Sequence, residues 1–153
     1  MSMRRAFAPL ICTLLVLAAA PARAAALPSI DAAAFGIELC PQSVCGAAIF
    51  AGVLNGRIGT TPAGGTFAVA VTHEALPDPF QQSAVTGGVF GLRLNGRDIH
   101  GAVTGGTLEN LGNNTFLVTM TLTATDGRVL TFEGILNHNV FPPTIVGHLT
   151  SGL

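Results

Sequence analysis

From Cys45 onward, the chain alternates short apolar runs with clusters of turn-forming residues. The pattern is clearest at Phe116, Val118, Met120 and Leu122, which occupy every second position with mostly threonines between them. A period of two is typical of a β-strand that buries one face in a hydrophobic core. The runs are separated by Asn-Gly, Gly-Gly and Asp-Gly pairs, which favour tight hairpins. The pattern therefore predicts an antiparallel all-β domain.

These runs give eight predicted strands. They are expected near residues 47–54, 57–61, 66–74, 84–94, 98–104, 115–125, 128–136 and 144–151. The short turns make neighbours in sequence neighbours in space. A meander of about eight strands can close into a small barrel, which leaves no exposed strand edge. We therefore predict a closed up-and-down β-barrel over residues 47–153, with a β-sandwich as the alternative.

The first 24 residues have the pattern of a secretory signal peptide. Arg4 and Arg5 precede an apolar run from Leu10 to Ala20, and small residues follow it. Such a segment is removed on export, here after residue 24 or as late as residue 26. The run is shorter than the about 20 residues that a membrane-spanning helix needs. The sequence thus predicts an exported bacterial protein, periplasmic or secreted, with no transmembrane helix.

Residues 25–46 are expected to form a short N-terminal segment outside the barrel. The stretch from Pro28 to Gly36 is the one place in the mature chain where a short helical turn is predicted. Cys40 and Cys45 follow it, and an even pair of cysteines in an oxidising compartment is usually a disulfide. Their spacing is longer than that of a redox C-x-x-C pair. We predict a structural disulfide that fixes this segment beside the first barrel strand.

The composition narrows the range of partners. The predicted mature chain has four arginines, no lysine and eight acidic residues, a net charge of −4 with the histidines neutral. It lacks the positive surface that a phosphate backbone attracts, so no nucleic-acid partner is expected. It also contains no Trp or Tyr, although outer-membrane barrels carry such residues at both membrane interfaces. The composition therefore argues against a membrane barrel.

The predicted strand order gathers the longer connections at one end of the barrel. These connections are Leu76–Ser83, Gly105–Asn114 and Asn137–Pro143, together with the turn Asn55–Arg57. Binding residues tend to lie on loops that a rigid scaffold holds. The candidate ligand- or partner-binding residues at this mouth are His73, Glu74, Asp78, Phe80, Asn137, His138 and Phe141.

Phe80 and Phe141 lie in proline-containing loops and have two interpretations. A stiff loop can hold an aromatic side chain ready for a partner. Alternatively, each ring folds back over the open end of the core, which is the interpretation that the sequence favours.

No catalytic motif is present. Ser83 and Ser151 lack the sequence context of an activated nucleophile, and no Cys–His signature occurs. His73, Glu74 and His138 could approach one another at the mouth, but they form none of the dense ligand motifs of metal sites. We expect no catalytic residue, no metal and no cofactor.

Three functions remain open from the sequence. The first is an exported barrel that binds a small apolar ligand or a protein partner at its mouth, and the second is a structural envelope protein with a filled barrel. The third is an enzyme of unknown type. The interior distinguishes the first two, because a barrel that its phenylalanines fill completely has no room for a ligand. Those phenylalanines are Phe50, Phe67, Phe90, Phe116 and Phe132.

Overall fold

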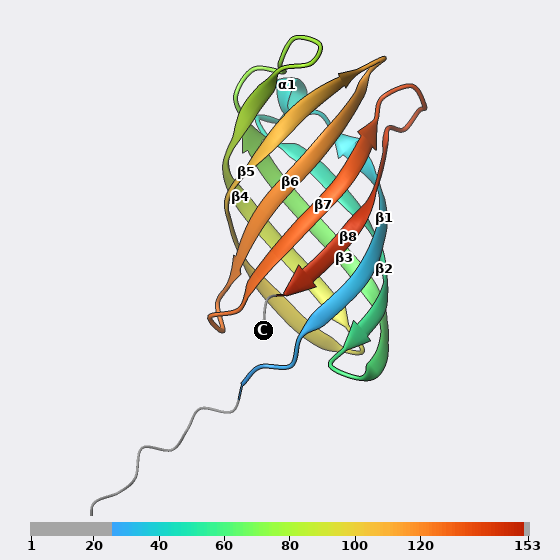
Figure 1. Ribbon diagram of the computed structural model, residues 1–153, viewed down its shortest axis with the longest axis vertical. Coiled ribbons are helices and arrows are strands. Elements are labelled where there is room, and N and C mark those ends of the chain that lie inside the picture. Colours follow the sequence, from blue (N-terminus) through green and yellow to red (C-terminus); the bar gives the residue numbers. More distant parts are fainter. Residues whose placement is uncertain (1–25, 152–153) are drawn as a thin grey trace, which may run out of the picture.

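Eight antiparallel strands follow one another around a closed barrel (Figure 1). The computed structural model describes residues 26–151, so the predicted signal peptide, residues 1–24, lies outside the described residues. The strands are β1 (Ile30–Cys40), β2 (Ala48–Ile58), β3 (Thr61–His73), β4 (Gln82–Leu94), β5 (Arg97–Gly112), β6 (Thr115–Ala124), β7 (Val129–Asn137) and β8 (Thr144–Ser151). One short helix, α1 (Gln42–Cys45), connects β1 to β2. Within the described range, no helix is long and apolar enough to cross a membrane.

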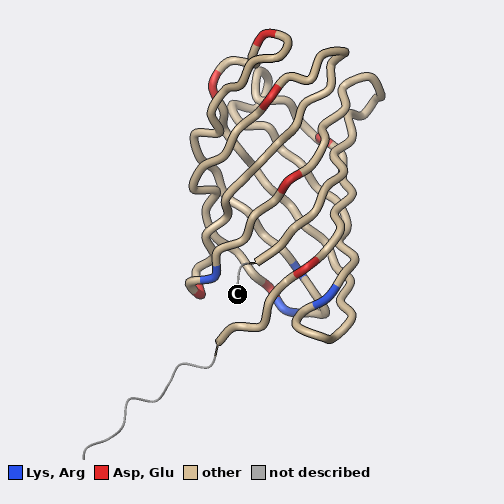
Figure 2. The backbone as a smooth tube through the Cα atoms, in the orientation of Figure 1, with Lys and Arg blue, Asp and Glu red and all other residues tan. Residues whose placement is uncertain are grey.

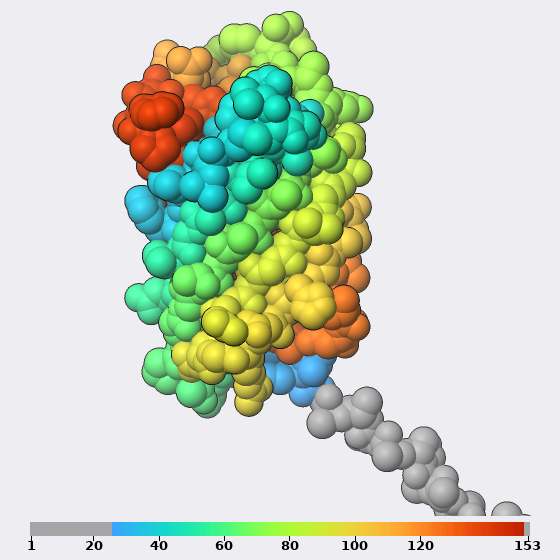
Figure 3. Space-filling model, turned by 180° about the vertical axis from the view of Figure 1, so that it is seen from behind, coloured from blue at the N-terminus to red at the C-terminus, as the bar shows by residue number. Residues whose placement is uncertain are grey.

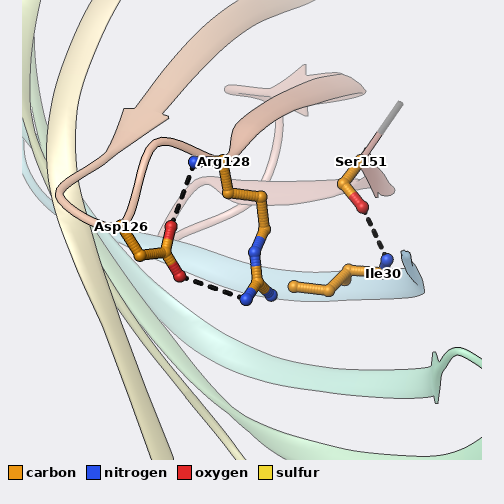
Figure 4. Close-up of polar contacts among 4 residues, drawn as sticks. All are labelled: Ile30, Asp126, Arg128 and Ser151. Carbon is orange, nitrogen blue, oxygen red and sulfur yellow. Dashed lines mark hydrogen bonds and ion pairs between the residues drawn. The ribbon is translucent and has the colours of Figure 1, made fainter. Parts of the chain in front are cut away.

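The barrel closes between its first and last strands. β1 pairs with β8 from Asp31 opposite Thr150 to Ile37 opposite Thr144. Next to the Asp31–Thr150 pair, the Ile30 amide donates a hydrogen bond of 2.7 Å to Ser151 Oγ (Figure 4). Every strand therefore has two neighbours, and the prediction of a closed meander is confirmed over the sandwich alternative.

One predicted turn is wrong, and its place is taken by regular strand. Residues 47–54 and 57–61 were expected to be two strands joined at Asn55-Gly56. Instead, β2 runs unbroken through this pair to Ile58, and the turn follows at Gly59 and Thr60. Gly56 serves close packing instead, because a Cβ there would lie 2.1 Å from the Asp31 carbonyl oxygen of β1. The Asn-Gly pair is thus explained by strand contact rather than by a hairpin.

Because two predicted strands are one strand, β2, the barrel needs another strand to reach eight. That strand comes from the segment that was predicted to lie outside the barrel. Residues 30–40 form β1, where a short helical turn was expected, so the barrel begins at Ile30 rather than at residue 47. The predicted disulfide between Cys40 and Cys45 is present. It lies in the connection from β1 to β2 and holds α1, instead of fixing a separate segment to the barrel wall.

The core consists of the inward-facing positions of all eight strands. Phe116, Val118, Met120 and Leu122 are all buried, as their alternation predicts. Bulky rings fit inside because glycines line parts of the wall. At Gly52 on β2, for example, a Cβ would lie 2.7 Å from the Phe67 ring and 2.1 Å from a backbone oxygen of β1.

Arg128 closes the end of the barrel that carries the tight turns (Figure 4). Only 11% of its side chain is exposed, and its Nη2 donates a hydrogen bond of 3.1 Å to Asp126 Oδ2. The Arg128 amide also donates to Asp126 Oδ1, at 3.0 Å. The nearly inaccessible side chains of Ile30, Leu94 and Leu130 complete the core at the ends of their strands. This end is therefore filled, and space for a ligand lies elsewhere.

Candidate functional site

The opposite end of the barrel carries the longer connections. They are the β1–β2 connection with α1, the β3–β4 loop and the β7–β8 loop (Figure 1). The loop predicted at Gly105–Asn114 is mostly strand, because β5 runs to Gly112, and only a tight turn at Asn113 and Asn114 connects it to β6. Asn55–Arg57, which was predicted to share this end, lies at the other one because β2 continues past it. The disulfide-closed connection takes its place. Figure 3 shows this connection in cyan, beside the β7–β8 loop in orange-red and the β3–β4 loop in green.

A cavity of about 290 Å³ lies inside this mouth. Its walls are inward-facing apolar side chains from the six strands β2 to β7, among them Phe50, Val71, Val85, Leu108, Val118, Met120 and Leu136. Further into the barrel, only about 30 Å³ remains among Phe67, Phe90, Phe132 and their neighbours. The phenylalanines therefore fill one half of the barrel and leave a hollow in the other.

α1 lies at the rim of this cavity and is tied to β3. Gln42 Nε2 donates a hydrogen bond of 2.8 Å to the His73 carbonyl oxygen, and the His73 amide donates to Gln42 Oε1, also at 2.8 Å. The disulfide closes the same short loop. On the chain-entropy estimate, so small a ring contributes about 2 kcal/mol of stability. The cross-link and the side-chain amide together fix α1 at the mouth.

The most buried charged group at the mouth is Glu38 of β1. Its side chain is only 6% exposed and lines the cavity. The Glu38 amide donates a hydrogen bond of 2.9 Å to the Pro143 carbonyl oxygen, which fixes β1 to the β7–β8 loop. His138 Nε2 lies 3.2 Å from Glu38 Oε2, but their geometry forms no hydrogen bond, and Nε2 is buried without a partner among the described residues. A carboxylate and an imidazole therefore line the cavity as a close pair that shares no hydrogen bond.

His138 itself is held in place from two sides. Its amide donates a hydrogen bond of 2.9 Å to the Asn114 carbonyl oxygen of the β5–β6 turn. Its ring packs against Phe116, with the ring centroids 5.3 Å apart and the planes tilted by 58°. The imidazole thus belongs to the rigid rim of the cavity rather than to a free loop.

Three of the predicted site residues line the cavity. They are His73, at the end of β3, Glu74, which follows it, and His138. His73 Nδ1 also contacts the Glu74 carbonyl oxygen. Within residues 26–151, no group of three or more His, Cys, Asp or Glu side chains is placed to hold a metal ion.

The other predicted residues lie outside the cavity lining. Phe80 and Phe141 are 81% and 98% exposed, so the interpretation that their rings cover the core is wrong. The positive φ of 64° at Phe80 and the hydrogen bond from its amide to the Asn110 carbonyl oxygen fix it in an outer loop. Asn137 Oδ1 accepts a hydrogen bond from the Asn139 amide and orders the β7–β8 loop, and Asp78 is exposed in the β3–β4 loop.

Sequence reasoning missed Glu38 and Gln42, because it placed both in a segment outside the barrel. One signal was present for Glu38. It stands in phase with Ile30, Ala32 and Ala34, at the spacing of two that defines one face of a strand. A glutamate in phase with a row of small apolar residues indicates an inward-facing charge, once the segment is recognised as a strand.

Comparison of this chain with protein-family models, with curated proteins and with solved structures finds no match. The functional argument therefore depends on the geometry of the site. That geometry combines an apolar chamber, a rim fixed by a disulfide and a helix, and a buried carboxylate beside an imidazole. Such a chamber with few polar groups is the usual form of a small-molecule site.

Proposed function

We propose that this protein is exported and binds a small apolar molecule in the cavity at the mouth of its barrel. The observation that carries the proposal is the apolar chamber of about 290 Å³ in a barrel that is otherwise tightly packed. Export is supported by the signal-peptide pattern of residues 1–24 and by the disulfide, because disulfides are typical of oxidising compartments outside the cytoplasm.

The volume of the chamber limits the size of the ligand. An engineered cavity of about 150 Å³ binds benzene, so a cavity about twice as large accommodates roughly a dozen non-hydrogen atoms. The walls offer mainly methyl, methylene and aromatic groups, which favour a ligand with an apolar body. The polar atoms that face the cavity lie at its rim, where they can meet a single polar group of the ligand.

The proposal is tested with 4-phenylbutanol, a neutral molecule of about this size, in a thermal unfolding experiment. A ligand that binds only the folded state stabilises it by about 2.7 kcal/mol at a concentration of 100 Kd. We expect the melting temperature of the protein to rise by several degrees, with saturation. No rise at any concentration would contradict the proposal.

Variants locate the binding site. Val118→Phe on β6 and Val71→Phe on β3 each place a ring in the cavity and should abolish the response to the ligand. Val146→Phe makes the same substitution on the exposed face of β8 and should leave the response unchanged. If both filled variants fold and still respond like Val146→Phe, the ligand does not lie in this cavity.

A further inference from the structure

We propose that the cavity selects a cationic amphiphile, an organic amine whose apolar body fills the chamber and whose ammonium group pairs with Glu38. This inference rests on the proposed function and adds the chemical class of the ligand. It depends on two independent observations, which are the buried Glu38 carboxylate at the rim and the distribution of charge over the whole barrel.

The first observation is the buried pair at the rim. A buried carboxylate is costly unless a cation and hydrogen-bond donors compensate it. Glu38 is almost inaccessible, and its neighbour His138 Nε2 gives it no hydrogen bond. An ammonium group in the cavity beside Glu38 supplies a positive charge and hydrogen-bond donors to its carboxylate.

The number of donors separates an amine from an alcohol. An ammonium group carries three N–H donors, whereas a hydroxyl carries one. The amine can therefore donate more hydrogen bonds to the Glu38 carboxylate than the alcohol can, and each of them is strengthened by charge.

The second observation is that the arginines lie at one end of the barrel, together with Asp31, Asp98 and Asp126, and leave the mouth end acidic (Figure 2). The four arginines of the described chain, Arg57, Arg93, Arg97 and Arg128, all lie at the end opposite the cavity, and the chain contains no lysine. The mouth end carries the acidic side chains Glu38, Glu74, Asp78 and Glu109. A mouth with this charge attracts cations and repels anions such as fatty acids.

Three ligands of the same size and different charge test the inference. They are 4-phenylbutylamine, 4-phenylbutanol and 4-phenylbutyrate, which are cationic, neutral and anionic at pH 7. Isothermal titration should give a Kd for the amine at least about tenfold lower than that for the alcohol, and the weakest binding for the carboxylate. A tenfold difference corresponds to about 1.4 kcal/mol.

Two charge-matched variants assign the preference to one side chain. Glu38→Gln keeps the size of the side chain and removes its charge, so it should bring the amine to within about twofold of the alcohol. Glu133→Gln makes the same change on the exposed face of β7 and should preserve the preference for the amine.

The outcomes separate this inference from the proposed function. If the wild-type protein binds the amine and the alcohol equally, or if Glu38→Gln keeps the preference, the choice of a cation is overturned while ligand binding stands. If none of the three ligands binds, the proposed function is overturned as well. The comparison of ligands on the wild-type protein decides the matter even if Glu38→Gln fails to fold.

Discussion

At the scale of single residues, side chains complete the mouth where the backbone pairing ends. The pairing between β2 and β3 ends at Ala48 and Val71, so no residue of β2 lies opposite His73. The side-chain amide of Gln42 forms hydrogen bonds with both the backbone N–H and the backbone C=O of His73, as a neighbouring strand would. The Gln42 side chain thus takes the place of a paired strand and holds α1 at the cavity.

A second residue pair gives a prediction at the opposite end. Arg93 Nε and Nη2 donate hydrogen bonds of 2.8 and 3.2 Å to the two carboxylate oxygens of Asp98. These hydrogen bonds, together with the charge of Arg93, lower the pKa of Asp98 below its usual value of 3.8. Because the pKa of Asp98 is lower in the folded state, the pair stabilises the fold at pH values above the pKa of the unfolded state. This stabilisation is lost as the pH falls through the pKa of the folded state.

We therefore expect Arg93→Gln to raise the pKa of Asp98 toward 3.8, as followed by NMR titration of its carboxyl carbon. Arg57→Gln serves as the control, because Arg57 pairs with Asp31 instead. Both partners are well exposed, so the effect on the free energy of unfolding should be small. An Asp98 that titrates identically in the wild-type and Arg93→Gln proteins would contradict the assignment.

At the scale of elements, β1 shows why the pattern of apolar and polar residues did not predict one of the strands. Three of its inward positions are small, namely Ala32, Ala34 and Gly36, while Phe35 and Leu39 project outward and are exposed. The apolar residues therefore do not alternate with polar ones, and the period of two disappears. β6 was predicted correctly because mostly threonines fill its outward positions. The sequence thus indicates a strand most clearly where its outer face is polar.

The glycines on the inner wall give a prediction at this scale. Gly52→Ala should destabilise the fold by about 1–3 kcal/mol, because the new methyl group would meet the Phe67 ring and backbone atoms of β1. Gly91→Ala is the control, because nothing lies within 4 Å of the Cβ that it adds. Denaturant unfolding measures both. Equal stability of the two variants would show that the wall is not tightly packed at Gly52.

At the scale of the whole molecule, the number of strands and the closed barrel followed from the sequence, whereas the cavity did not. Two errors in the predicted strands compensated each other, because the prediction divided β2 into two strands and omitted β1. The later strands therefore kept their place in the order, which is why His73 and His138 were expected together at the mouth. The hollow depends on the directions of the phenylalanine rings, and Phe67, Phe90 and Phe132 border the small void in the other half of the barrel.

The whole molecule therefore has two unlike ends. One is closed by Arg128 and tight turns and carries all the arginines of residues 26–151, and the other holds an apolar cavity with an acidic rim. This polarity makes the mouth the functional end of the barrel in our account. The central claim is that a small molecule enters the cavity there and contacts its walls.

Met120 provides the most direct test of this claim. Its side chain lines the cavity, and the other two methionines, Met1 and Met3, belong to the predicted signal peptide. Mature protein labelled with ¹³C at the methionine methyl group should therefore give a single signal. During titration with 4-phenylbutanol, we expect this signal to shift with saturation, because the ligand ring contacts the methyl group. In Val118→Phe, the same titration should leave it in place.

The contrary result is equally clear. A Met120 methyl signal that stays unchanged at ligand concentrations that saturate the rise in melting temperature would place the ligand outside the cavity and contradict the account.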